Sequence, residues 1–554
     1  MPRVTRFAVS VTCYVLASCC LHAQVNVLTA NYGNDRTNAN LAETVLNTGN
    51  VTPGTFGKLG SFPVDGQIYA QPLFVSGLNI AGQQRDVVFV ATMRNSVYAF
   101  DAGTLTTAAP LWRVNFGAAV SSDFLDFDDI DPEVGILSTP VIDPGSNTLY
   151  LVANTFEKGD SVYRLHALDL LTGAEKPGSP VEIKGAVRGT GDSSDGTTVS
   201  FVARQHLQRP GLLLQSGRIY IAFGSHADTF PYHGWIFAYR TDNLQTQAGV
   251  FNATPNGSSG SIWQSGRGLA SDADGNLYVG TANGDYDGET SFSESFLKLS
   301  PDLKLLDWFT PFDWQRLSER DRDLGSLGPV MIPGTTKFFG GDKFGNLYLI
   351  DTQQMGHLGV EGAESPQTVR PVQFGGIFTT ALWMSDAGPL VYLSEMSDWT
   401  GSLRMTDGKF ETDLHSQSLT VASDIPYQGM AISASGGAAG TGILWMTTGD
   451  HQQDGVPGTL HAFDAMDLTN EIWNSGQNPD RDAMGGFAKF VSPTIANGRV
   501  YVPTFSNQLN VYGLLPEDGG PPAGVEATRS PVKRVVRPAR AGQVRATPKK
   551  SLDK

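Results

Sequence analysis

The chain has 554 residues, of which 40% are hydrophobic, 10% aromatic and 17% charged. This hydrophobic fraction supports a large core and excludes a disordered chain, while 63 Gly and 31 Pro residues indicate many turns. The net charge of −16 argues against nucleic acid as the main partner, because a phosphate backbone is bound by a basic surface.

Residues 1–23 have the pattern of an export signal. Arg3 and Arg6 precede an apolar run over residues 7–16, and small residues follow it. This order of basic, apolar and small-residue regions directs a chain out of the cytoplasm. No other segment reaches the roughly 18 uninterrupted apolar residues of a membrane span. We therefore expect an exported protein without a transmembrane span that is periplasmic, secreted or anchored to the envelope.

The cysteines leave two ways of processing this signal open. All three of them lie within it, at Cys13, Cys19 and Cys20. Cleavage after Ala23 leaves a mature chain without cysteine. Alternatively, the tetrapeptide that ends at Cys19 resembles a lipoprotein box, and Cys19 would then carry a lipid anchor. Either route leaves the folded body without disulfides, a thiolate nucleophile or a thiolate metal site.

Residues 24–55 form a lead segment, and residues 56–515 repeat one unit eight times. Each unit has a short strand rich in β-branched and aromatic residues, then a polar loop and a second strand. Further apolar strands flank several units, as at residues 111–114 and 471–474. The predicted strand pairs are 88–92 with 97–101, 149–151 with 165–169, 219–221 with 235–239, 277–279 with 296–299, 338–340 with 347–351, 391–393 with 402–405, 444–446 with 460–464, and 500–502 with 509–512.

Four antiparallel strands per unit, repeated radially, predict an all-β fold, an eight-bladed β-propeller. Helical periodicity is absent, which argues against a helical repeat fold. A lone strand at residues 56–62 precedes the first unit, and the eighth unit ends at residues 514–515 without an outer strand. We therefore expect the N-terminal strand to complete the last blade and close the ring.

Residues 516–554 differ from the rest of the chain, because they are rich in Pro, Ala and Gly and almost free of aromatic residues. They also hold many basic residues, among them Lys533, Arg534 and Lys549. This composition predicts a disordered tail. Two roles remain open for it, a tether to anionic lipid or peptidoglycan and a simple solvated linker.

Polar side chains gather in the loops that a propeller places at one mouth of its central channel. These are the loops between the second and third strands of each blade and the connections between blades. They include Arg209, His226, Asp342 and a run of acids over residues 126–133. This pattern favours a site for a small ligand or a metal ion, although long polar loops are also usual at this face. His206, His226 and His233 offer a further alternative, a transition-metal site.

Several units resemble the docking motif of pyrroloquinoline-quinone (PQQ) propellers, Ala-x-Asp-x-x-Thr-Gly-x-x-x-Trp. The fullest match is Ala167 to Gly173, and two other units keep the Ala-x-Asp start with Trp112 or Trp473 at the end. The resemblance covers roughly residues 56–515. It implies an eight-bladed quinoprotein alcohol dehydrogenase-like propeller that holds PQQ and Ca²⁺ at the mouth of its channel.

The resemblance also implies roles for individual residues. Trp263 is placed where the family stacks its quinone, and Lys343 matches the basic residue at the quinone oxygens. Asp321 matches the catalytic base, and we count Lys343 with it as catalytic. The implied calcium ligands are Asp228, Asn283, Asp321 and Asp323, and the implied cofactor contacts are Trp263, Lys343, Arg209 and His226.

The sequence also departs from this family pattern. Thr229 stands where the family has a calcium-binding Glu, with Asp228 beside it, and the vicinal disulfide of many members is impossible here. Two functions therefore remain open. One is an exported quinoprotein oxidoreductase that acts on an alcohol or sugar. The other is a cofactor-free propeller that binds an envelope protein or a glycan, and a surface ion-pair network at Asp321 and Asp323 is compatible with it.

Overall fold

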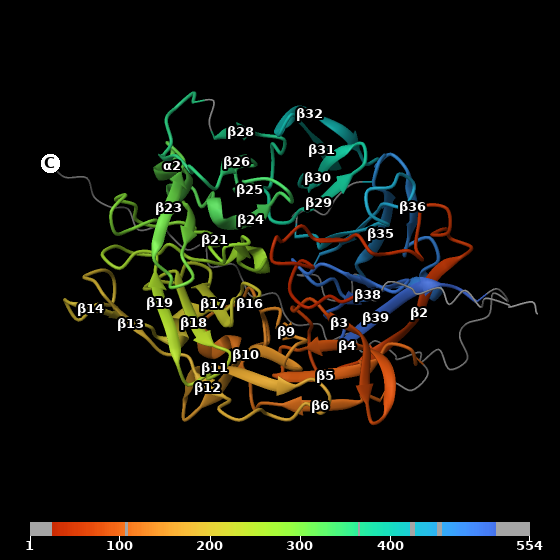
Figure 1. Ribbon diagram of the computed structural model, residues 1–554, viewed down its shortest axis with the longest axis horizontal. Coiled ribbons are helices and arrows are strands. Elements are labelled where there is room, and N and C mark those ends of the chain that lie inside the picture. Colours follow the sequence, from red (N-terminus) through yellow and green to blue (C-terminus); the bar gives the residue numbers. More distant parts are fainter. Residues whose placement is uncertain (1–24, 106–108, 364–365, 421–426, 451–456, 517–554) are drawn as a thin grey trace, which may run out of the picture.

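The computed structural model describes residues 25–105, 109–363, 366–420, 427–450 and 457–516, which form a ring of eight antiparallel blades (Figure 1). The predicted eight-bladed β-propeller is thus confirmed. The predicted export signal with its cysteines, and the tail beyond Pro516, lie outside the described residues. No helix within the described ranges is long and apolar enough to cross a membrane.

Each blade has four main strands. In every blade, the second and third strands are one of the eight predicted strand pairs. From the inside outwards the blades are β3 (Leu73–Ile80), β4 (Gln83–Ala91), β5 (Ser96–Asp101), β6 (Trp112–Asn115); β9 (Val141–Asp143), β10 (Thr148–Glu157), β11 (Asp160–Asp169), β12 (Val181–Glu182); β16 (Leu213–Gln215), β17 (Arg218–Ser225), β18 (Trp235–Arg240), β19 (Gln247–Asn252); β20 (Ala270–Ser271), β21 (Leu277–Gly280), β22 (Phe296–Leu299), β23 (Leu305–Thr310); β24 (Leu327–Met331), β25 (Lys337–Gly341), β26 (Leu347–Asp351), β28 (Gln367–Val369); β29 (Ala381–Ser385), β30 (Gly388–Ser394), β31 (Thr400–Thr406), β32 (Lys409–Gln417); β33 (Met430–Ser433), β34 (Ile443–Thr448), β35 (Thr459–Asp464), β36 (Glu471–Asn474); and β37 (Thr494–Ala496), β38 (Arg499–Pro503), β39 (Gln508–Leu514), β2 (Phe56–Pro63).

Shorter elements lie in the loops and connections between these strands. The hairpin β13–β14 projects from the connection between blades two and three, and β27 pairs in parallel with the outer strand of blade four. The remaining elements are β1 (Ala39–Asn40), β7 (Val120–Ser121), α1 (Ser122–Leu125), β8 (Glu133–Val134), β13 (Ala186–Arg188), β14 (Thr198–Ser200), η1 (Ala203–Gln205), β15 (His206–Leu207), η2 (Gln264–Gly266), α2 (Trp314–Glu319), η3 (Leu324–Ser326), β27 (His357–Leu358) and α3 (Pro479–Asp482).

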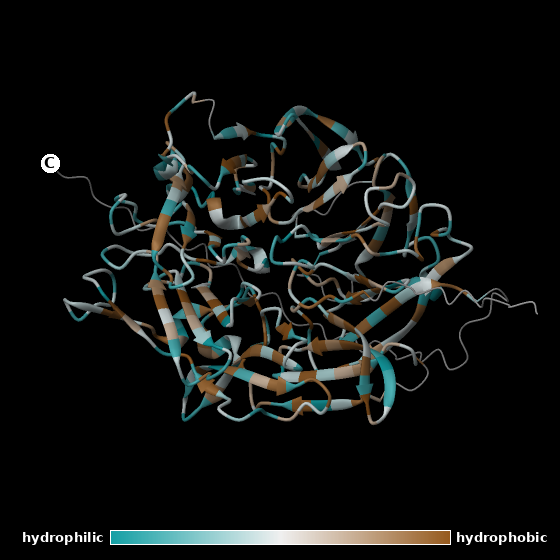
Figure 2. Ribbon diagram, viewed as in Figure 1, coloured by the Kyte–Doolittle hydropathy of each residue, from teal (hydrophilic) through white to brown (hydrophobic). Residues whose placement is uncertain are grey.

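Hydrophobic residues are frequent along the strands of the blades (Figure 2). Their side chains on both faces of the inner strands hold neighbouring blades together. In β17, Ile219 and Ile221 pack in a cluster with residues of blade two, whereas Tyr220 and Ala222 pack with residues of blade four. Successive side chains of a strand point to opposite faces, so a continuous apolar run serves both neighbours. The core is therefore a series of layers between blades.

A tryptophan connects blades one and two in the way that the docking motif predicts. The indole of Trp112, on the outer strand β6, donates to the carbonyl of Leu170, 2.9 Å away. A Cβ on Gly173 would lie only 2.6 Å from Cε3 of that indole, so only glycine leaves room for the ring. Asp169 fixes this turn, because its Oδ1 accepts from the amides of Leu171 and Thr172.

The ring closes between its two chain ends. Strand β2 pairs with β39 from Phe56 opposite Leu514 to Pro63 opposite Gln508, and so completes blade eight as predicted. The side chain of Phe56 is fully buried, with its ring centroid 5.0 Å from that of Trp473 and 5.3 Å from that of Trp445. The last blade is thus anchored to blade seven by the first long strand of the propeller.

Residues 25–43, which we call the inner strap, are a feature that the sequence did not predict. This segment, red in Figure 1, follows the inside of the ring and contacts each blade in turn. Its partners, in blade order, are Phe74 for Val27, Ile142 for Leu28, Leu212 for Thr29, Ser271 for Asn34, Met331 for Asp35, Leu382 for Thr37, Ile432 for Asn38 and Ile495 for Asn40. One continuous segment therefore hydrogen-bonds to the innermost part of all eight blades.

Candidate functional site

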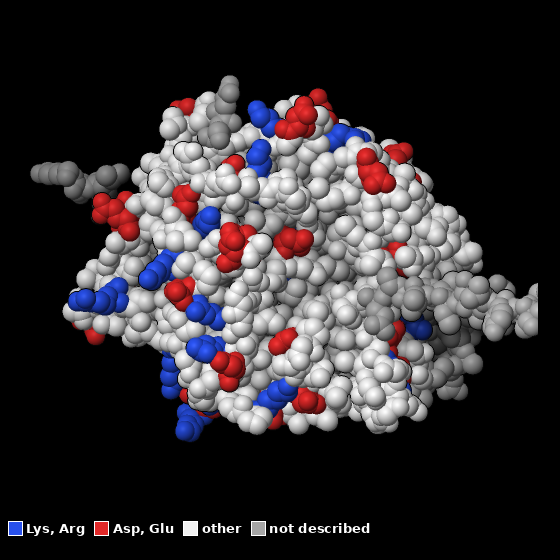
Figure 3. Space-filling model, viewed as in Figure 1, with Lys and Arg blue, Asp and Glu red and all other residues white. Residues whose placement is uncertain are grey.

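A cavity of about 400 Å³ lies at one mouth of the channel, and the predicted classes of loop line it. Asp228 comes from the loop between β17 and β18, and Lys343 from the loop between β25 and β26. Trp263, Asp321 and Asp323 come from the connections between blades. This volume is within the range of small-molecule sites. Acidic and basic groups are interspersed on the face shown in Figure 3, without a single basic patch.

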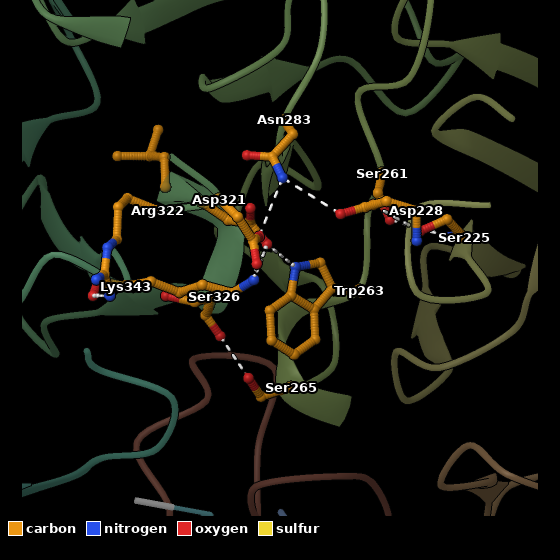
Figure 4. A network of polar contacts seen from close by, with 12 residues as sticks. Ser225, Asp228, Ser261, Trp263, Ser265, Asn283, Asp321, Arg322, Ser326 and Lys343 are labelled. Atoms are coloured by element: carbon orange, nitrogen blue, oxygen red, sulfur yellow. Dashed lines mark hydrogen bonds and ion pairs between the residues drawn. The ribbon is translucent and has the colours of Figure 1, made fainter. Parts of the chain in front are cut away.

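Lys343 forms the centre of an ion-pair network in this cavity (Figure 4). Its Nζ lies 2.6 Å from Oδ1 of Asp321 and 2.9 Å from Oδ2 of Asp323. The same oxygen of Asp323 accepts from the indole Nε1 of Trp263 at 3.0 Å. The ammonium group also lies 5.3 Å from the centroid of the Trp263 ring. Four residues predicted for one site are thus in direct contact.

Asn283 links this network to Asp228. Its Nδ2 donates to Oδ1 of Asp321 at 3.1 Å and to Oδ2 of Asp228 at 3.3 Å. Asp228 is itself held by the hydroxyl of Tyr232, 2.7 Å away, and by that of Ser225, 3.0 Å away. The loops of three successive blades therefore direct two carboxylates and one amide to the same point.

The two aspartates beside Lys343 have opposite electrostatic environments. Burial and the nearby charges of Asp321 and Asp228 raise the pKa of Asp323 to about 6, although the ammonium of Lys343 opposes this. Burial would also raise the pKa of Asp321, but attraction and hydrogen bonding from Lys343 hold that pKa below its ordinary value. The side chain of Asp321 is 66% exposed and that of Asp323 only 5%. Asp321 is therefore the accessible, ionised carboxylate of the pair.

Glu294 lies beneath this network and was not predicted. Its side chain is fully buried, and its Oε2 accepts from the backbone amide of Leu324 at 2.7 Å. Burial, followed by the charge of Asp323, raises the pKa of Glu294 well above its ordinary value. Through this hydrogen bond, Glu294 supports the connection carrying Asp321 and Asp323. No motif marks it, because it lies between two serines just before β22.

The donor set can be tested against the predicted Ca²⁺. Within the described ranges, no three His, Cys, Asp or Glu side chains form a group that could hold a metal ion. The predicted set instead depends on Asn283, whose buried Oδ1 has no protein partner. If the amide turns over, Oδ1 faces Asp228 and Asp321, so three hard oxygens converge. Ca²⁺ needs six to eight oxygens. The residues therefore fit a Ca²⁺ ion whose other ligands come from cofactor and water.

Arg209 and His226 lie in different positions relative to the cavity. Arg209 lines it, with its guanidinium 5.8 Å from the ring centroid of Phe490. His226 is buried and does not line the cavity. Its ring packs edge-on against Phe127, with the two centroids 5.1 Å apart. His226 therefore forms part of the wall behind the lining residues.

The histidines predicted as an alternative metal site have separate partners. His206 Nε2 accepts from the backbone amide of His233 and from the indole of Trp235, both at 3.1 Å. The ring of His233 instead contacts Thr254 and the carbonyl of Asp192. Burial lowers the pKa of His206 to about 3 and that of His226 to about 4. His206 and His226 are therefore neutral, and their role is structural.

The far wall of the cavity also went unpredicted. It comes from the connections that precede blades six, seven and eight, with Phe378, Tyr427, Lys489 and Phe490. Lys489 Nζ lies 2.5 Å from Oδ1 of Asp129, a member of the predicted acidic run. These connections carry no recognisable motif, so only the closed ring brings their side chains opposite Trp263 and Lys343.

Comparisons with known proteins bear on the fold. The sequence matches no protein-family model and no curated protein significantly. Among solved structures, quinohemoprotein alcohol dehydrogenase ADHIIG from Pseudomonas putida HK5 has a TM-score of 0.59 and 13% identity, covering 93% of this chain and 83% of that one. The quinohemoprotein alcohol dehydrogenase from Comamonas testosteroni has a TM-score of 0.56 with the same identity and coverage. BamB from Moraxella catarrhalis has a TM-score of 0.44 and 13% identity, and the match covers 83% of this chain and 99% of that one. The predicted resemblance is thus confirmed for the fold: this chain has the eight-bladed propeller of the quinoprotein alcohol dehydrogenases.

Proposed function

We propose that this protein is a quinoprotein oxidoreductase that oxidises an alcohol or a sugar outside the cytoplasm, with PQQ and Ca²⁺ at the mouth of the channel. The observation that carries this proposal is the convergence of Trp263, Asp321, Asp323, Lys343 and the pair Asp228–Asn283 on one cavity. These residues come from three blades. They contact one another but belong to none of the hydrophobic clusters between the blades.

The cavity has the groups that a planar, anionic quinone needs. Trp263 offers an aromatic surface for stacking. The cations that line the cavity are Arg209, Arg322, Lys343 and Lys489, and they suit the three carboxylates of PQQ. Lys343 is placed to donate to an electronegative oxygen of the ring and to stabilise negative charge that develops there. When bound, PQQ supplies the electron acceptor for the oxidation.

Asp321 is the candidate general base. Its carboxylate is exposed to the cavity and ionised at neutral pH, since Lys343 holds its pKa low. It can therefore take the proton of a substrate hydroxyl, an effect that typically contributes a factor of 10² to 10⁴. Asp228, Asp321 and Asn283 would hold the Ca²⁺ ion. Asp323, the fourth predicted ligand, is left out of this set because its Oδ2 already binds Lys343 and Trp263.

Titration of the purified protein with PQQ, with and without Ca²⁺, tests binding. A ligand that binds only the folded state at 100 times its Kd adds about 2.7 kcal/mol to the free energy of unfolding. We expect a Ca²⁺-dependent rise in Tm and a change in quinone absorbance. An unchanged Tm up to millimolar Ca²⁺ and PQQ would refute cofactor binding.

The Asp321→Asn variant tests catalysis separately from binding. It should still bind PQQ but lose at least 100-fold in dye-linked oxidation of the best substrate, because the amide cannot accept the proton. Asp302→Asn is the matched control, because Asp302 is an exposed carboxylate paired with Arg218 in an outer turn. Wild-type rates in Asp321→Asn would overturn its role as the base.

Binding of an envelope protein is the second candidate, because apolar side chains are exposed on the same face. Phe230 is 63% exposed, Phe374 68% and Met396 38%, and all three lie in loops of the cavity face. Photo-cross-linking from position 230 should capture a discrete partner if this function is correct. Position 306 is the control, because Leu306 is 53% exposed on an outer strand.

A further inference from the structure

Three arginines lie close together next to the large cavity, and all of them are buried. Arg36 is 0% exposed, Arg267 4% and Arg209 5%. Arg36 belongs to the inner strap, Arg209 to the segment before blade three, and Arg267 to the segment before blade four. Burial lowers the pKa of Arg36 and Arg267 to about 9 and that of Arg209 to about 10.

The segment Gly266-Arg267-Gly268 is shaped to hold the other two guanidinium groups. A Cβ on Gly266 would lie 2.5 Å from Nη1 of Arg209, and a Cβ on Gly268 would lie 2.5 Å from Cζ of Arg36. Gly266 also has a φ of +84°, which other residues rarely adopt. Glycines on both sides of Arg267 thus bring three positive charges close together.

These guanidinium groups are fixed by neutral partners. Arg36 donates to the carbonyls of Ala30 and Leu269, and Arg267 donates to those of Arg36 and Thr380. No carboxylate within the described ranges forms a hydrogen bond or ion pair with any of the three. Asp35 and Asp129 act on them only at longer range. A buried cation without a charge partner is strongly unfavourable.

Four N–H donors in this group have no protein acceptor. They are Nη2 of Arg36, Nη2 of Arg209, Nε of Arg267 and Nε2 of Gln71. The orientation of the Gln71 amide is determined, because its Oε1 accepts from the backbone amide of Asn31 at 2.8 Å. Gln71, Arg209 and Arg267 line one small cavity of about 20 Å³, whereas Arg36 does not. This cavity adjoins the large one and shares Arg209 with it. Such a volume holds one particle of about the size of a water molecule.

We propose that this small cavity is a binding site for a small monovalent anion of the size of chloride, held by Arg209, Arg267 and Gln71. A single halide ion accepts from all three donors and neutralises part of the buried positive charge. Phosphate and sulfate are too large for this volume. Ala30 and Asn31 of the inner strap line the same cavity, so the ion would connect the strap to blades three and four.

The site does not depend on the proposed quinone chemistry, because its unpartnered donors belong to Arg209, Arg267 and Gln71, of which only Arg209 lines the large cavity. Phe378 and Phe490 line both cavities. Arg209 is the single charged group that lines both cavities. A carboxylate of a ligand in the large cavity is therefore a competing occupant for Arg209. Experiments on the full chain without quinone exclude that competitor.

The first test is the stability of the full chain in potassium chloride against potassium gluconate, at equal ionic strength and pH. We expect Tm to rise with chloride and to saturate, because one site fills. Arg209→Met should lower the affinity for chloride at least tenfold. Arg204→Met is the matched control, because Arg204 is exposed on the same segment and stacks on Phe124, and it should keep the wild-type response.

The second test does not depend on any variant. Crystals of the wild-type protein soaked in bromide should show an anomalous peak between Arg209 and Arg267. Absence of this peak, together with equal Tm values in chloride and gluconate, would overturn the proposal and leave water as the occupant. A bromide peak combined with no response to PQQ would support the anion site and reject only the proposed function.

Discussion

At the scale of single residues, Lys343 determines the charge balance of the candidate site. Its side chain is only 19% exposed, and its ammonium pairs with both Asp321 and Asp323. Removal of one partner from a buried ion pair costs about 3–5 kcal/mol, since the remaining charge stays buried. The stability of this site and its chemistry are therefore coupled through one side chain.

Lys343→Met should accordingly lower the free energy of unfolding by several kcal/mol at pH 7. The loss should be smaller at pH 5, because Asp323, with its raised pKa, then takes up a proton and its charge disappears. Urea denaturation at both pH values measures this. The double variant Lys343→Met/Asp323→Asn should recover much of the loss, and failure to do so would show that packing, not charge, causes it.

His226 should make the protein less stable as the pH falls. Its folded-state pKa is about 4, below the ordinary value of 6.5, because the ring is buried. Between these values the unfolded chain binds a proton that the folded chain does not, so stability decreases as pH falls through this window. From pH 7 to pH 5 this one group costs about 2 kcal/mol.

His226→Phe should remove this loss, since Phe cannot be protonated and fits beside Phe127. Urea denaturation of wild type and variant at pH 7 and pH 5 measures the difference. His415→Phe, at an exposed position, should keep the pH dependence of the wild type. An identical pH dependence in His226→Phe and wild type would contradict the assignment.

At the scale of elements, contacts between neighbouring blades decide stability. Gly173→Ala should destabilise the fold by roughly 1–3 kcal/mol, because the new methyl group would overlap the indole of Trp112. Gly159→Ala is the matched control, because Gly159 also has a positive φ, of 88°, but no atom lies within 4 Å of its Cβ position. Equal losses of Tm in the two variants would mean that backbone strain, not docking, is responsible.

At the scale of the whole molecule, the ring depends on the closure between its first and last strands. Phe56→Ala should cost about 3–5 kcal/mol, because it leaves a cavity between Trp445 and Trp473 at this closure. Urea denaturation followed by tryptophan fluorescence measures the loss. Phe312→Ala is the control, because Phe312 is 51% exposed, and a similar loss in both variants would contradict a special role for the closure.

The repeat, and with it the fold, could be predicted from the sequence alone. Each unit carries a pair of short, continuously apolar strands such as β17 and β18, and local hydrogen bonding decides how these strands pair. The lone strand at residues 56–62 indicated closure because the eighth unit lacked an outer strand. Trp263, Asn283 and the segment 321–323 were also predicted as site residues from the sequence, because each lies in a recognisable stretch beside a strand.

How these side chains combine could be seen only in the folded chain. The contacts of Lys343 with two aspartates, the far wall with Lys489 and Phe490, and the buried Glu294 join residues that are distant along the chain. The inner strap, which carries Arg36, hydrogen-bonds to all eight blades, so no local pattern could mark it. Strand pairing follows from neighbours in sequence, whereas charge and burial depend on every group that the closed ring brings to its axis.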